Sequence, residues 1–175
     1  MMSQEELPQP RMTAEEVAET LRRLANLLEI KGENPFKSAA YRRAAVVIEE
    51  MGPALFDHWR AGTLGELPNI GTAIEKKVDE MLRTGELTAV RRLEQEIPRG
   101  VEELLRVPGI GPKTARALWQ ELGITSLEEA ARAAESGRLR EVRGLGARAE
   151  QRILAGIRQL RAGASSASSG EDPAS

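Results

Sequence analysis

The sequence predicts an all-helical protein, and three of its features lead to this fold class. The hydrophobic residues are mostly Ala, Leu and Val, a mixture that favours helices over strands. Apolar residues recur at helical spacing, as in the series Val17, Leu21, Leu24 and Leu28. No stretch long enough to form a strand alternates apolar with polar residues, which is the pattern of a half-buried strand. We therefore expect a compact helical fold for these 175 residues.

Three helices are expected before the first glycine-rich turn. The first begins at Thr13, which forms a capping box with Glu16, and it ends at Gly32. The second covers residues 35–50, between an Asn-Pro and a Gly-Pro pair. A third, short amphipathic segment covers residues 55–59. These elements predict a helical unit ahead of the turn.

A short pattern then occurs three times, and it is the most informative feature of the sequence. The copies are LPNIGTAIEKKV (67–78), VPGIGPKTARAL (107–118) and VRGLGARAEQRI (142–153). Each copy places two glycines, or Asn and Gly, around one apolar residue and continues into an amphipathic helix. The paired positions are Asn69 and Gly71, then Gly109 and Gly111, then Gly144 and Gly146.

This hairpin has the features of a phosphate-binding turn. Glycines let the backbone turn sharply and approach a ligand closely, and the turn leads into a helix start with free N–H groups and a positive dipole end. Lys113 and Arg148 fall two residues after the second glycine, where a cation can hold a phosphate. The alternative is a packing motif that needs glycine only for its turn. Three copies, two with a basic residue, favour binding to a nucleic-acid backbone.

The charge is unevenly distributed along the chain. The formal net charge is -2, but residues 136–161 contain seven arginines against Glu141 and Glu150. A basic face can therefore exist in spite of the acidic total. The alternative reading is a solvated helix face with excess arginine.

The organisation expected along the chain is two helical domains between disordered tails. Residues 1–11 and 162–175 have no apolar periodicity and should be disordered. Residues 12–95 should form a first domain with one hairpin, and residues 96–161 a second with two. The absence of cysteine excludes disulfides and thiolate metal sites. No membrane span or secretory signal is present, so we expect a cytoplasmic protein.

The three hairpins resemble helix-hairpin-helix motifs, and the resemblance extends further. The segments LLEIKGENPFKSAAYRRAAVVI and ELPNIGTAIEKKVDEMLRTGEL are similar to the N-terminal lyase-type domain of family X DNA polymerases, the DNA polymerase beta relatives. The bacterial members are the most similar. The resemblance covers roughly residues 12–161 and implies a role in DNA repair. No segment resembles the metal-binding palm of these enzymes, so we expect no polymerase activity from this chain.

The resemblance assigns a catalytic role to Lys77. In the animal relatives, a lysine at this position forms a Schiff base with the sugar of an abasic site, which gives dRP/AP lyase activity. Helix geometry is an independent consideration, because it places Lys77 beside the apolar face and Lys76 nearly opposite that face. The alternative is a lysine whose stem covers apolar surface.

The rest of the family's DNA pocket is only partly present. Lys37 and Tyr41 match a basic residue and a tyrosine of this pocket, and Phe36 stands where relatives have a histidine. Phe36 can still stack on a base. Ala73 and Gly65 replace two lysines, which should weaken phosphate capture.

The resemblance also implies Na+ or K+ at a hairpin, held by backbone carbonyls. The carbonyls are those of Leu105, Val107 and Ile110, with a second set at Leu67 and Ile70. We expect no other cofactor.

Two functions remain open from the sequence. The first is a DNA-binding module for gapped, nicked or abasic DNA, with lyase chemistry at Lys77. The second is a non-enzymatic helical adaptor that recruits a separate polymerase or nuclease through protein contacts. Salt dependence separates the two, because binding to the DNA backbone weakens steeply as salt rises.

Overall fold

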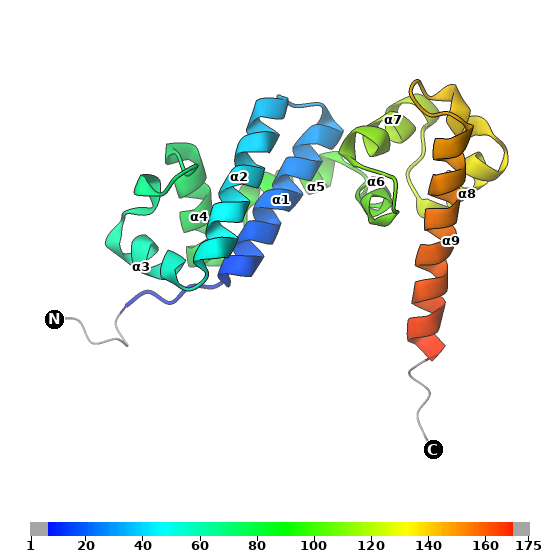
Figure 1. Ribbon diagram of the computed structural model, residues 1–175. Coiled ribbons are helices and arrows are strands. Elements are labelled where there is room, and N and C mark those ends of the chain that lie inside the picture. Colours follow the sequence, from blue (N-terminus) through cyan, green and yellow to red (C-terminus); the bar gives the residue numbers. More distant parts are fainter. Residues whose placement is uncertain (1–6, 170–175) are drawn as a thin grey trace, which may run out of the picture. The chain divides into compact units, whose positions relative to one another are not determined.

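The computed structural model describes residues 7–169, with side chains described through residue 164, and every regular element in this part is a helix (Figure 1). The all-helical fold class is confirmed for this part of the chain. The chain divides into two compact units, with the boundary between Glu96 and Ile97; we expected it between residues 95 and 96.

The first unit has five α-helices and a short 3-10 helix in its described residues. They are α1 (Ala14–Lys31), α2 (Pro35–Met51), α3 (Ala54–Ala61), η2 (Leu64–Glu66), α4 (Thr72–Thr84) and α5 (Thr88–Glu96). Helices α1 and α2 lie side by side and form the centre of this unit (Figure 1).

Helix α1 shows how local sequence signals produce these elements. Thr13 accepts a hydrogen bond from the Glu16 N–H, and the Glu16 carboxylate accepts one from the Thr13 N–H, which completes the capping box. Gly32 ends the helix in the left-handed conformation, with φ of 79°. Leu28, expected in the core, is only half-buried, whereas Leu27 and Ile30 are fully buried. Since α1 packs against α2, α4 and α5, it buries a broader face than one apolar stripe.

The second unit places several short helices and one long helix, α9, around its two hairpins. The elements are α6 (Arg99–Glu103), η3 (Leu104–Arg106), α7 (Pro112–Leu122), α8 (Leu127–Glu135), η4 (Arg138–Glu141) and α9 (Ala147–Ser169). Two glycines allow close packing here. A Cβ on Gly100 would lie 1.7 Å from the Thr125 carbonyl oxygen, and a Cβ on Gly156 would lie 2.7 Å from the Pro108 carbonyl oxygen.

The chain ends differ in part from the expected disorder. Residues 1–6 and 170–175 lie outside the described residues. Residues 7–11 form no helix, yet the Arg11 N–H donates to the Leu82 carbonyl at 2.8 Å and the Arg60 side chain donates to the Pro8 carbonyl at 3.1 Å.

At the other end, α9 continues through Ser169, whereas the sequence predicted a disordered tail from residue 162. Alanine is the best helix former, and extending an existing helix is far easier than starting one. The segment of residues 162–169, which contains three alanines among its eight residues, therefore continues a helix that is packed at its beginning. None of the helices in residues 7–169 is both long and apolar enough to span a membrane.

Candidate functional site

The three repeated segments form three hairpins with the same backbone geometry. Each begins with a 3-10 helix, η2, η3 or η4, and continues into a tight turn. The turn bonds run from Ile70 N–H to Leu67 O (3.2 Å), from Ile110 N–H to Val107 O (3.0 Å) and from Leu145 N–H to Val142 O (3.0 Å). The second glycine of each copy then accepts the first bond of α4, α7 or α9 through its carbonyl. The sequence repeat is thus a structural repeat.

The two glycine positions of each hairpin have different roles. Asn69, Gly109 and Gly144 have φ values of +65°, +100° and +91°. Glycine adopts such angles without strain, and asparagine is among the few other residues that tolerate them. This first position is therefore required by the turn itself.

The second position is not required by the turn, although the sequence suggested that both glycines serve it. Gly71 and Gly111 have φ of -85° and -94° with ψ of 179°, an extended conformation open to any residue. A Cβ on Gly71, Gly111 or Gly146 would meet nothing within 4 Å. Neither backbone strain nor packing explains these glycines, so each hairpin presents a bare helix start to its surroundings.

These helix starts also lack the caps found elsewhere in the chain. Thr13 caps α1 and Ser126 caps α8 by accepting a backbone N–H bond, whereas α4 and α7 have no side-chain cap. The first N–H groups of a helix have no partner within the helix. In the hairpins they stay available to an outside acceptor at the positive end of the helix dipole.

Cations stand beside two of the three helix starts. Lys113 and Arg148 are each the second residue of their helix, and both are exposed. Neither has a hydrogen bond or ion pair with any described side chain. Ala73 holds the corresponding position of α4. Hairpins two and three therefore carry a cation on the first turn of their own helix, which hairpin one does not.

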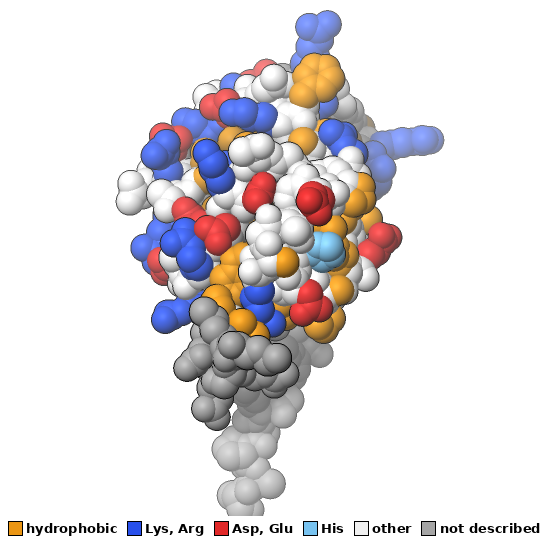
Figure 2. Space-filling model, turned by 90° about the vertical axis from the view of Figure 1, so that its left-hand side faces the viewer, with side chains coloured by type: hydrophobic (Ala, Val, Ile, Leu, Met, Phe, Trp, Pro, Cys, Tyr) orange, Lys and Arg blue, Asp and Glu red, His pale blue; other side chains and the backbone are white. Residues whose placement is uncertain are grey.

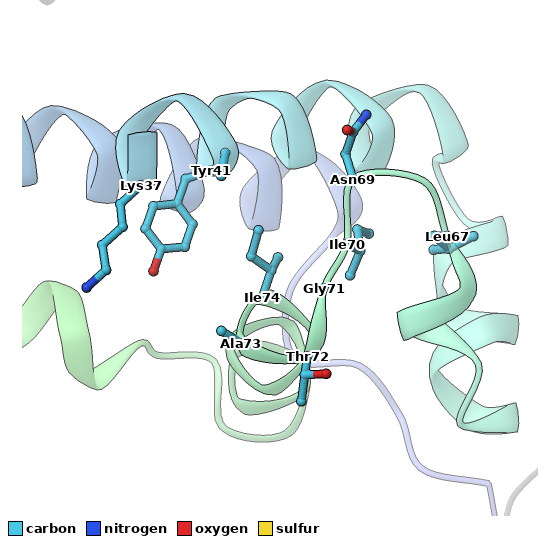
Figure 3. Close-up of a pocket in the computed structure, with 10 residues that line it drawn as sticks. Lys37, Tyr41, Leu67, Asn69, Ile70, Gly71, Thr72, Ala73 and Ile74 are labelled. Carbon is cyan, nitrogen blue, oxygen red and sulfur yellow. The ribbon is translucent and has the colours of Figure 1, made fainter. Parts of the chain in front are cut away.

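The first hairpin adjoins an open hollow of about 560 Å³ (Figure 3). Lys37 and Tyr41 point into it from α2, and Asn69 and Gly71 border it from the turn (Figure 3). Phe36 is not part of the lining and is 80% exposed. The structure thus brings together four of the predicted DNA-binding residues and leaves Phe36 outside the hollow.

Lys77 has the position expected from helix geometry. It is half-buried, whereas Lys76 is exposed, and the buried face of α4 consists of Ile74, Val78, Met81 and Leu82. The Nζ atom of Lys77 lies 5.8 Å from the centroid of the buried Tyr41 ring, within the range of a cation–π contact. Lys77 does not line the hollow itself, but Tyr41 connects the two.

One feature near the first hairpin was missed by the sequence reasoning. A Cβ on Gly65 would lie 2.5 Å from Oε2 of Glu75. A carboxylate therefore occupies the space beside the position where family X relatives have a lysine. Glycine at position 65 was visible in the sequence, but the placement of Glu75 required the fold.

In some parts of the chain the arginines form ion pairs, and in others they have no acidic partner among the described side chains. On the face drawn in Figure 2, basic and acidic side chains lie interspersed. Several arginines of the first unit pair with carboxylates, as Arg22 does with Glu49 and Arg42 with Glu29. Among the arginines of residues 136–161, Arg140 pairs with Glu150 at 2.9 Å. Arg148 and Arg152 have no such partner among the described side chains.

The backbone carbonyls expected to hold Na+ or K+ are partly occupied by hydrogen bonds within the protein. The Val107 carbonyl accepts the turn bond from Ile110 and keeps one of its two lone pairs. Carbonyl oxygens are suitable ligands for these ions. The cation stays a prediction. No cluster of three His, Cys, Asp or Glu side chains that could bind a metal occurs in the described residues.

The fold and the repeated hairpins define a class, that of all-helical helix-hairpin-helix proteins. Residues 12–87 match a family described as a helix-hairpin-helix domain. Residues 101–159 match a family described as a SAM-like helix-hairpin-helix tandem. All three hairpins lie within these two matches.

Comparison with individual proteins shows which helix-hairpin-helix proteins the chain resembles. The chain is 30% identical over 143 residues to the DNA polymerase/3'-5' exonuclease PolX of Bacillus subtilis, covering 82% of this chain and 25% of that protein. It is 31% and 33% identical over 91 residues to the Holliday junction branch migration complex subunit RuvA of Acidovorax sp. and of Leptothrix cholodnii. These matches cover 45% and 44% of the RuvA chains. The chain thus spans a quarter to under half of these relatives, and its helix-hairpin-helix region is related to that of PolX.

Proposed function

We propose that this chain binds the phosphate backbone of DNA without sequence preference and acts in DNA repair or recombination. The observation that carries this proposal is the geometry of the hairpin helix starts, where uncapped N–H groups follow a glycine with open space around it. The relatives support it, since one is a DNA polymerase and the others are subunits of a Holliday junction branch migration complex.

The binding mode follows from the chemistry of these helix starts. A phosphate oxygen accepts bonds from the first N–H groups of α7 or α9, and the nearby Lys113 or Arg148 neutralises its charge. The bare glycine lets the phosphate approach the backbone. Phosphates carry no base identity, so such contacts hold DNA of any sequence.

The double substitution of Lys113 and Arg148 by Ala tests this proposal. We expect weaker binding to duplexes of any sequence, and a slope of log affinity against log salt that is smaller by about two units. Fluorescence anisotropy over a salt series with two unrelated duplexes measures both quantities. An unchanged slope would reject the assignment, and wild-type binding that ignores salt would favour the adaptor function.

A second candidate activity is dRP/AP lyase chemistry at Lys77, favoured by its half-buried position over the Tyr41 ring. The Lys77 amine adds to the aldehyde carbon of an abasic sugar, and water leaves to give an imine. Loss of a proton from C2′ to solvent breaks the bond between C3′ and its phosphate oxygen. Hydrolysis of the imine then frees the lysine.

Borohydride trapping tests the lyase proposal, because it reduces the imine to a stable crosslink. With DNA that carries an incised abasic site, we expect a crosslink from the wild-type chain and from Lys76→Ala, but none from Lys77→Ala. Ala73 and the carboxylate of Glu75 beside Gly65 should make the reaction slow. A wild-type chain that binds this DNA at low salt without forming a crosslink has no lyase activity.

A further inference from the structure

We propose that a hollow on α9 is a second phosphate-binding site, so that α9 holds two phosphates of a nucleic-acid backbone. The hollow has a volume of about 520 Å³ and is lined by Arg148, Gln151, Arg152 and Ala155. This inference rests on the proposed function, because it extends the contact from the start of α9 along the helix.

The lining residues form one continuous exposed face. Arg148, Arg152 and Ala155 are separated by four and three residues, which places them on the same side of the helix. All four lining residues are exposed. Because the side chain of Ala155 is short, the base of the hollow stays accessible between the side chains of Arg148, Gln151 and Arg152.

The charge of this face has no counterpart within the described residues. Arg148 and Arg152 make no hydrogen bond or ion pair with the described side chains. Glu150, the acid of the first turn, is 3% exposed and turned toward Arg140. Two like charges four residues apart on a helix repel each other and destabilise the helix. A structural role does not explain this pair, whereas a bound anion would relieve the repulsion.

All residues that line the hollow belong to α9, between the start of this helix and the contact of Gly156 with the second hairpin. The hollow begins at the start of α9, next to Gly146, and ends just before Gly156, which packs against Pro108 in the turn of the second hairpin. Ten residues of α-helix span about 15 Å. The arginines therefore extend the anion-binding surface from the third hairpin toward the second.

The side chains of the hollow specify a phosphodiester rather than a base. A guanidinium binds phosphate oxygens through two parallel N–H bonds, and the Gln151 amide can donate another. None of the lining residues is aromatic, so the hollow offers no stacking platform for a base. The ligand is therefore the sugar-phosphate backbone.

The test is Arg152→Ala in the full chain, with Arg132→Ala as the matched control. Arg132 is an exposed arginine of the same unit, beside Leu122 and Gly123 at the opposite end of α7 from its hairpin. Anisotropy over a salt series should show a several-fold loss of duplex affinity for Arg152→Ala and a slope smaller by about one unit. Arg132→Ala should match the wild type in both quantities.

The outcomes separate this inference from the proposed function. Equal binding by Arg152→Ala and Arg132→Ala, while the Lys113 and Arg148 substitutions still weaken binding, would overturn the second site alone. A wild-type chain that does not bind DNA would overturn both. Tighter binding of polyglutamate than of the duplex by the wild type at equal charge concentration, with Arg152→Ala losing affinity only for polyglutamate, would overturn the phosphate assignment in favour of an acidic protein partner. Thermal unfolding at the wild-type midpoint verifies that Arg152→Ala remains folded.

Discussion

At the scale of single residues, the two paired positions of each hairpin, occupied by glycine everywhere except at Asn69, have different roles. Gly109 supports a backbone angle that other residues avoid, whereas Gly111 has an ordinary angle and open surroundings. The turn does not require glycine at position 111, and the helix start that follows is uncapped. We infer that this glycine is kept so that a ligand can approach the helix start. This difference leads to opposite expectations for the same substitution at the two positions.

Gly111→Ser should stabilise the fold and weaken DNA binding. The backbone at Gly111 already has the extended conformation of an N-cap, and a serine hydroxyl there can accept an N–H bond from the first turn of α7. We expect a gain of a few tenths of a kcal/mol in the free energy of unfolding. The hydroxyl then competes with phosphate for the same N–H groups. Chemical denaturation and anisotropy measure the two effects.

Gly109→Ser is the control for this experiment. At φ of +100°, a side chain is strained, so we expect a loss of about 1–3 kcal/mol in the free energy of unfolding. If Gly111→Ser leaves DNA affinity unchanged, the start of α7 does not contact the backbone.

At the scale of elements, α9 depends on one glycine in its interior. Glycine normally weakens a helix by about 1 kcal/mol relative to alanine. Gly156 is kept because a Cβ there would lie 2.7 Å from the Pro108 carbonyl oxygen and 3.0 Å from Cγ1 of Val107. This contact fixes α9 against the turn of the second hairpin.

Gly156→Ala should therefore destabilise the protein by about 1–3 kcal/mol, the usual cost of overpacking. Gly163→Ala is the matched substitution in the same helix, where a Cβ would meet nothing within 4 Å. It should stabilise the protein by up to about 1 kcal/mol. Urea denaturation compares the two variants. Stabilisation by both would show that α9 does not pack closely on the second hairpin.

At the scale of the whole molecule, the two units carry unequal parts of the candidate site. The first unit contains the hollow with Lys37 and Tyr41, the half-buried Lys77 and a helix start whose nearby cation, Lys37, comes from α2 and not from α4 itself. The second unit contains two helix starts whose cations, Lys113 and Arg148, have no partner among the described side chains, and the basic hollow of α9. A net charge of -2 is compatible with DNA binding, because contacts depend on local charge within about 8–10 Å at ordinary salt. We therefore assign backbone binding mainly to the second unit.

The sequence by itself predicted the first three helices, the three hairpins with the helices that follow them, and the border position of Lys77. These features follow from local signals, namely helical periodicity, the capping box of Thr13 and the glycine repeat, which act between residues close in the chain. The helical continuation past Arg161 was missed because its Ala- and Ser-rich composition also resembles a disordered tail.

Only the tertiary structure decided the features that depend on contacts between distant segments. It placed Tyr41 beneath Lys77, Glu75 over Gly65 and Pro108 against Gly156. It also decided which arginines pair with carboxylates and which have no such partner among the described side chains. A sequence lists charges and glycines, but whether a charge finds a partner, or a glycine a close neighbour, depends on distances of a few ångströms that packing alone sets.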